Sequence, residues 1–112
     1  IQNVVNEMRD EFNSNPKTMK VIIGPHIQES SYEVGEELKE LFNNYKKAIT
    51  AKNKKYHLNL SRVATHTLLD QGFSLGNIEI SAEDTYADRK YFSFRRDRPA
   101  IVQTMLAYIR LK

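Results

Sequence analysis

The sequence predicts an α/β fold of mixed α+β layers, in which a mixed β-sheet is flanked by helices. Three segments carry apolar residues at helical spacing, and four shorter segments are apolar or aromatic runs or alternate between apolar and polar residues. In chain order they are helix, strand, helix, helix, strand, a short aromatic strand and strand, which is typical of mixed layers. The length of 112 residues suits one domain.

The first helix is predicted by apolar residues spaced i, i+3, i+4 and i+7. They would share one buried face and are Ile1, Val4, Val5, Met8 and Phe12. A turn is expected at residues 13–17, NSNPK, followed by a short buried strand at 19–25 that ends with Gly24 and Pro25. Because neither a capping residue nor a methionine precedes the helix, we expect the chain to be a fragment of a longer protein.

The second helix is predicted after Ser30 and Glu33, which have the Ser-x-x-Glu spacing of a capping box. The residues expected on its inward face are Val34, Leu38, Leu41, Phe42 and Tyr45. The lysine-rich stretch 46–55 has little apolar periodicity, so it is predicted as a loop or a frayed helix end.

The third helix is predicted after Asn59 or Ser61, either of which could cap it. Its predicted inward face holds Leu60, Val63, Ala64, Thr67 and Leu68. Gly72 fits the position just past the helix end, where the left-handed backbone is least costly for glycine.

The C-terminal third alternates as strands do. Residues 77–81, NIEIS, predict one strand, and residues 103–111 predict another with apolar side chains on both faces, as in the interior of a sheet. Between them, YFSFRRDRP at 91–99 contains the predicted short aromatic strand, and we consider the stretch in an extended conformation. Tyr91, Ser93 and Arg95 would then lie on one face, opposite Phe92, Phe94 and Arg96.

Charged residues are grouped along the chain, although the net charge of +3 is small. Acidic residues cluster at 29–40, and basic residues follow at 46–62 with no acid among them. Such blocks usually mark solvated faces, and less often a field that steers an anionic ligand. Aromatic residues do not alternate with the lysines at stacking intervals, which argues against nucleic-acid binding.

Two classes of protein are excluded by what the sequence lacks. There is no cysteine, so disulfides and thiolate metal sites are excluded. No apolar run approaches the roughly 20 residues of a membrane span. We therefore expect a cytoplasmic protein with no membrane partner.

Histidines are the remaining candidates for metal chemistry. His26, His57 and His66 show no i, i+4 pair and no carboxylate at ligand spacing, so the chain alone predicts no zinc site. His26 follows Gly24 and Pro25 directly after a strand, where ligand loops often lie in α/β proteins. A plain loop histidine is the competing interpretation.

Arg95 and Arg96 lie beside aromatic residues and are candidates for anion binding. A guanidinium group can hold a phosphate through two hydrogen bonds or stack on a base. The same groups could instead pair with Asp97 and brace a turn before Pro99. The residues alone leave both interpretations open.

Four stretches together resemble the C-terminal half of the laccase-domain family. They are IIGPHIQESSYEVGEE from residue 22, YHLNL from residue 56, NIEISAEDTYADRKYFSFRRD from residue 77, and the closing apolar segment. Members of this family are also called multicopper polyphenol oxidase-like proteins and purine nucleoside phosphorylases. The resemblance implies one α/β domain of about twice this length, so residues 1–112 would be its C-terminal half.

The activity that the resemblance implies is phosphorolysis of adenosine, inosine and methylthioadenosine, together with deamination of adenosine. In the family the metal is zinc, with copper as the alternative, held by two histidines and a cysteine of the N-terminal half. None of His26, His57 and His66 matches a ligand position. We therefore expect no catalytic residue and no metal ligand in this chain, and no activity from it alone.

The matched stretches contain four candidate residues for binding substrate or phosphate: Arg95, Arg96, His26 and Tyr32. The expected partners are a purine nucleoside, phosphate, and either the N-terminal half or a second copy of the chain. Two alternatives stand beside this interpretation. One is a stand-alone basic module that binds nucleic acid, and the other is a regulatory half that assembles with a separate N-terminal chain.

Overall fold

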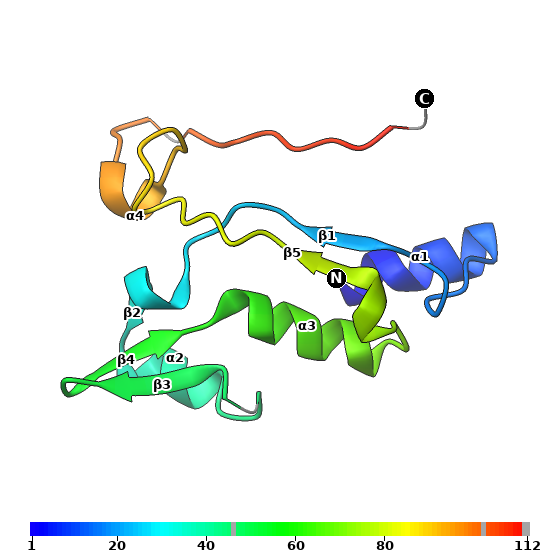
Figure 1. Ribbon diagram of the computed structural model, residues 1–112, viewed down its shortest axis with the longest axis horizontal. Helices are drawn as coiled ribbons and strands as arrows, with labels where there is room; N and C mark the ends of the chain where they lie inside the picture. Colours follow the sequence, from blue (N-terminus) through cyan, green and yellow to red (C-terminus); the bar gives the residue numbers. More distant parts are fainter. Residues whose placement is uncertain (46, 102, 111–112) are drawn as a thin grey trace.

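The computed structural model describes residues 1–45, 47–101 and 103–110, and it confirms the predicted mixed α+β class. Two 3-10 turns, η1 and η2, accompany the helices and strands (Figure 1). The elements in chain order are α1 (Gln2–Phe12), β1 (Val21–Ile23), η1 (Glu29–Ser31), β2 (Glu33–Val34), α2 (Glu36–Leu41), β3 (Ile49–Lys52), β4 (Lys55–Leu58), α3 (Leu60–Asp70), η2 (Leu75–Asn77), β5 (Ile78–Ile80) and α4 (Phe94–Asp97).

The strands form two small sheets, one parallel and one antiparallel. β1 pairs in parallel with β5, with Val21 opposite Ile78 and Ile23 opposite Ile80. The antiparallel sheet has the strand order β2-β4-β3. Since α3 follows β4 directly and leads toward β5, the chain passes from one sheet to the other through this helix (Figure 1).

The β3–β4 hairpin corrects the prediction of a loop or frayed helix at 46–55. Asn53 and Lys54 both have left-handed backbones, with φ of 52° and 61°, as a two-residue hairpin turn of type I′ requires. The register places Ile49 opposite Leu58, so that apolar side chains meet across the pair. Lys46 lies outside the described residues.

The segment around the predicted capping box also differs from its prediction. Ser30 lies in η1, and Glu33 begins β2 because its backbone pairs with that of His57. The second helix therefore begins later, after Gly35. Leu41, expected to face inward, is 66% exposed.

α3 contributes residues to two apolar cores. In the first, Val34, Ala48 and Leu58 are buried; partly buried residues around them include Leu38 and Phe42 of α2, and Leu60 and Val63 of α3. In the second, Val5, Leu68 and Phe73 are buried against Val21, Ile23 and Ile78 of the parallel sheet. α3 therefore packs against both cores.

Both ends of α3 agree with the sequence. The side chain of Asn59 accepts a hydrogen bond from the backbone N–H of Arg62 at 2.9 Å, which caps the first turn. Gly72 has a φ of 90°, the left-handed backbone that favours glycine after a helix end. Both signals are local, and the predicted start and end of the third helix are confirmed.

The outer surface of α1 and the C-terminal segment are more exposed than predicted. Val5 is the one residue of the predicted α1 face that is buried, whereas Val4 and Phe12 are 60% and 74% exposed. Residues 103–110 form no regular structure, so the predicted strand is wrong for the described part of 103–111. A strand needs a neighbour for its backbone hydrogen bonds, and among the described residues β1 and β5 pair with each other and with no further strand.

The short aromatic strand predicted within 91–99 is also wrong. Ser93 is instead the N-cap of the short helix α4, and Arg98 ends that helix with a left-handed backbone. None of the helices in the described ranges has the length and apolar character needed to cross a bilayer.

Candidate functional site

An open cleft of about 890 Å³ lies among the segment before β2, the start of α3, the loop at 85–99 and the C-terminal segment. Three aromatic rings, those of Tyr32, Phe92 and Phe94, contribute to its mainly apolar wall. The full lining is Ile27, Tyr32, Leu60, Thr85, Phe92, Ser93, Phe94, Arg95, Arg98, Pro99, Gln103, Thr104 and Met105. Its positive charges come from Arg95 and Arg98.

Arg95 and Tyr32 meet at this cleft. The guanidinium carbon of Arg95 lies 5.3 Å from the centroid of the Tyr32 ring, which is cation–π geometry. One Nη atom of Arg95 also donates a hydrogen bond to the backbone carbonyl of Glu33. Of the five guanidinium N–H groups, the described residues engage the donors of one nitrogen, so others remain for an anion at the cleft.

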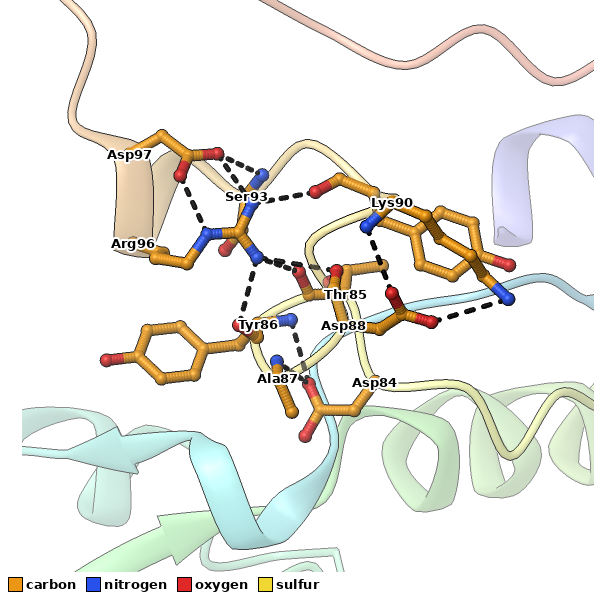
Figure 2. A network of polar contacts seen from close by, with 10 residues as sticks. Asp84, Thr85, Tyr86, Ala87, Asp88, Lys90, Ser93, Arg96 and Asp97 are labelled. Atoms are coloured by element: carbon orange, nitrogen blue, oxygen red, sulfur yellow. Dashed lines mark hydrogen bonds and ion pairs between the residues drawn. The ribbon is translucent and has the colours of Figure 1, made fainter.

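Arg96 has a different environment, although it is the next residue (Figure 2). Its guanidinium donates to both carboxylate oxygens of Asp97, at 2.7 and 2.9 Å. It also donates to the carbonyls of Thr85 at 3.0 Å, Tyr86 at 3.0 Å and Tyr91 at 2.7 Å. This geometry fits the bracing interpretation, because the donors of Arg96 are directed at its own loop.

Asp97 completes this brace. The Arg96 side chain and the backbone N–H of Ser93 both donate to its carboxylate and together lower the pKa of Asp97. Arg96 and Asp97 line a separate, smaller hollow with Arg89, Tyr91 and Phe92. The two neighbouring arginines thus serve different surfaces.

Asp84 is a second anchor of the same loop. One carboxylate oxygen accepts from the backbone N–H of Tyr86 at 2.9 Å, and the other accepts from the Ser31 hydroxyl at 2.6 Å. Burial raises the pKa of Asp84, but these hydrogen bonds outweigh burial and lower it overall. This anchor was not identified from the sequence, although an aspartate bonding the N–H two residues on is a known turn signal.

His26 lies at the carboxyl end of β1, where a bridge to Asp84 continues the parallel pairing. Its Nδ1 is 2.9 Å from the carbonyl oxygen of Gly24, so Nδ1 carries the proton and donates it. Its Nε2 faces the Gln28 side chain at 3.4 Å. His26 is half-buried and does not line the cleft, but the next residue, Ile27, does.

The basic stretch is partly neutralised by the acidic block. Lys55 forms an ion pair with Glu33 at 2.8 Å, and Lys39 of α2 pairs with Glu36. Lys52 precedes the exposed hairpin turn, and Lys54 lies in it.

The residues described here do not fit a zinc or copper centre. His26 follows β1, His57 lies on β4 and donates toward the Glu29 carbonyl at 3.0 Å, and His66 lies on α3. No group of three or more His, Cys, Asp or Glu side chains is placed to hold a metal ion within residues 1–45, 47–101 and 103–110. No step of a reaction can be derived through a metal from these residues.

Comparison with known proteins relates the whole chain to one family. The family model described as multi-copper polyphenol oxidoreductase laccase matches residues 1–112. The crystal structure of the hypothetical protein YfiH from Bacillus licheniformis superposes with a TM-score of 0.75 at 32% identity, covering 86% of this chain and 39% of that one. No curated protein matches the chain.

A second solved structure supports the fold. YlmD from Geobacillus stearothermophilus gives a TM-score of 0.75 at 23% identity, covering 86% of this chain and 38% of that one. The chain thus spans well under half the length of either relative. Since the family model extends over all 112 residues, the chain belongs to the multi-copper polyphenol oxidoreductase laccase family.

Proposed function

We propose that this chain is the C-terminal part of a zinc-dependent purine nucleoside phosphorylase of the cytoplasm. It would act on adenosine, inosine and methylthioadenosine and also deaminate adenosine. Membership of the laccase family supports the proposal, because members of the family that the sequence resembles are also called purine nucleoside phosphorylases. The metal, zinc or copper, would be held by residues other than those described here, since these do not fit it.

The observation that carries the proposal is Arg95 stacked on Tyr32 at the edge of an aromatic cleft. Phosphorolysis needs a site for a flat purine and a site for phosphate close to each other. Aromatic ring faces such as those of Phe92 and Phe94 suit a purine. A guanidinium with unengaged donors suits a phosphate oxygen.

The four candidate residues then take different roles. Arg95 would contact phosphate, and Tyr32 would hold the Arg95 guanidinium in place. Arg96 would keep the loop wall in shape through its carbonyl contacts. His26 would help to shape the cleft through its neighbour Ile27. It would also do so through its own backbone carbonyl, which accepts a hydrogen bond from the Thr85 N–H at 3.1 Å.

Substituting the two arginines in a complete domain tests these roles. The domain would be made by fusing this chain to the part of Bacillus licheniformis YfiH outside the match. Arg95→Ala should lower kcat/KM for inosine phosphorolysis about 10- to 100-fold, as expected for a lost hydrogen bond to a charged group. Adenosine deamination should fall less, because water rather than phosphate is its second substrate.

Two controls separate phosphate binding from bracing. Arg62→Ala removes an exposed arginine of α3 that does not line the cleft and should leave both activities unchanged. Arg96→Ala should lower both activities together, along with the melting temperature, because it releases the loop. Equal losses of phosphorolysis and deamination in Arg95→Ala would contradict the phosphate role of Arg95.

A further inference from the structure

Two parts of the chain that are far apart in sequence form two walls of the open cleft. Ile27 and Tyr32 belong to one wall, and residues 92–99 belong to the other. Arg95 reaches from the second wall to the ring of Tyr32, with its guanidinium carbon 5.3 Å from the ring centroid. Since cation–π attraction requires the cation within about 6 Å of the centroid, a small displacement of one wall would separate the pair. The contact therefore depends on how the two walls are held together.

A hydrogen bond between Ser31 and Asp84 joins the two walls beside this contact. The Ser31 hydroxyl donates to Oδ2 of Asp84 at 2.6 Å, although 53 positions separate the two residues in sequence. Ser31 directly precedes Tyr32, and Asp84 directly precedes the loop at 85–99. Both residues are half-buried, and a hydrogen bond to an ionised carboxylate is roughly twice as strong as a neutral one. This bond is therefore placed to fix the distance between the walls.

Tyr86 links Asp84 to the neighbouring arginines (Figure 2). Its backbone N–H donates to Oδ1 of Asp84 at 2.9 Å, and its carbonyl accepts from Nη1 of Arg96 at 3.0 Å. Because Arg95 is the residue before Arg96, a displacement of Asp84 would move the backbone from which the Arg95 side chain extends. A continuous series of contacts thus runs from Asp84 to the base of Arg95.

The other contacts between the walls do not replace this bond. The hydrogen bond from Arg95 to the Glu33 carbonyl is itself part of the arrangement that has to be held. Among the described residues, the Ser31–Asp84 bond is the one hydrogen bond between 29–33 and 84–99 in which Arg95 takes no part. Removing it would leave these two segments joined by the hydrogen bond of Arg95 alone.

We propose that Asp84 is a positioning residue of the cleft, which holds Arg95 on the Tyr32 ring through its hydrogen bond with Ser31. Asp84 does not line the cleft, so it acts on a ligand through Arg95. Its effect on catalysis rests on the proposed function, in which Arg95 contacts phosphate. Loss of the Ser31–Asp84 bond should then weaken the use of phosphate and spare the aromatic part of the cleft.

The position of Arg95 can be read by NMR in the 112-residue chain, independently of any activity. The face of the Tyr32 ring shields nearby protons, so the side-chain protons of Arg95 should resonate upfield of those of an exposed arginine. Ser31→Ala should abolish most of this upfield shift, and Ser31→Thr, which keeps a hydroxyl, should preserve it. Ser30→Ala removes the neighbouring exposed hydroxyl and should leave the shift unchanged. The methyl signals of the buried Leu58 would show that each variant remains folded.

Kinetics of the complete domain, fused to the part of Bacillus licheniformis YfiH outside the match, test the effect on phosphate. Ser31→Ala should raise the KM for phosphate about 5- to 10-fold, the size of one ordinary hydrogen bond, and should change adenosine deamination by less than about twofold. Asp84→Asn removes the charged acceptor of the Ser31 hydroxyl but keeps an oxygen for the Tyr86 N–H, so its effect should be similar. In an Arg95→Ala background, Ser31→Ala should change the KM for phosphate by less than about twofold, because both substitutions act on the same contact.

Two results would overturn the proposal. One is an upfield shift of Arg95 that is absent from the parent chain or unchanged in Ser31→Ala. The other is an increase in the KM for phosphate that is as large in the Arg95→Ala background as in the parent domain. A parent domain without phosphorolysis would contradict the proposed function alone, because the NMR shift would still decide whether Asp84 positions Arg95.

Discussion

The antiparallel hairpin and the parallel sheet bury their apolar side chains to different extents. β2, β3 and β4 enclose a core with α2 and the start of α3, in which Ala48 is fully buried and Leu58 is 1% exposed. β1 and β5 cover one face with the second core, while Ile22 on the other face is 69% exposed. The hairpin region is closed by its own chain, whereas the second face of the parallel sheet is exposed at Ile22.

Sequence distance explains much of this difference. The hairpin core is assembled from residues 32–63, so its strands and helices meet across short loops that are cheap to close. The parallel strands β1 and β5 lie far apart in the chain and meet through α3. A further strand at an edge of such a sheet has to come from elsewhere in the chain or from another chain.

Two matched substitutions that shorten a side chain test most sharply the comparison between the closed hairpin core and the exposed sheet face. Leu58→Ala should reduce the free energy of unfolding by about 2–5 kcal/mol, because it opens a cavity in the closed core. Ile22→Ala should change it by less than about 0.5 kcal/mol, because most of the side chain is already in water. Urea unfolding measures both values. Similar losses for the two variants would show that the exposed sheet face is covered in solution.

The elements that the sequence predicted well depend on local signals. α3 begins with a capping amide at Asn59 and ends before a left-handed Gly72. β5 was predicted from the alternation in residues 77–81 and is confirmed at Ile78–Ile80. Each of these signals acts between residues a few positions apart, so the sequence alone contains it.

The elements that were missed are not marked by residue types in the sequence. The hairpin turn uses Asn53 and Lys54 rather than asparagine and glycine, and the surrounding lysines hide the alternation of β3 and β4. The stretch at 91–97 bends because Arg96 reaches the carbonyls of Thr85 and Tyr91. Every residue has a carbonyl, so no residue type in the sequence marks these acceptors.

The candidate site, too, could be predicted from the sequence only in part. The family motif made both Arg95 and Arg96 candidates, but it could not separate an arginine that lines the cleft from one that braces the loop. Tyr32 gains its place beside Arg95 through the pairing of the adjoining strand β2 with β4. The sequence therefore offers these residues as candidates, but it could not predict their different environments.

A smaller effect should appear in the acid stability of the hairpin region. Glu29 accepts from the Thr50 hydroxyl at 2.6 Å and from the Asn59 amide at 2.8 Å, and the Thr50 bond is the main cause that lowers the pKa of Glu29 below 4.5. A lowered folded-state pKa contributes stability above the unfolded-state value, and this contribution is lost as pH falls through the folded-state value.

Thr50→Val isolates this contribution, because valine keeps the branched shape and removes the hydroxyl. The variant should lose less stability than the parent chain as the pH falls below about 4.5, and it should be less stable than the parent near pH 7. Thermal melts between pH 3 and 7 provide the comparison. Parallel pH curves for the two proteins would show that Thr50 does not stabilise the ionised carboxylate.

The smallest effect on the free energy of unfolding is expected in the C-terminal segment, residues 103–110. It tests most directly which parts of the chain are closed and which are exposed. Ile109 is 91% exposed, so Ile109→Lys should change the free energy of unfolding of the isolated chain by no more than about 0.5 kcal/mol. In a packed core the same substitution would bury an unpaired charge at a far larger cost. Light scattering should show weaker self-association of the variant, because it breaks an exposed apolar surface. A loss of more than about 1 kcal/mol would mean that the tail already packs against its own chain, and residues 103–110 would then belong to the closed part of the molecule.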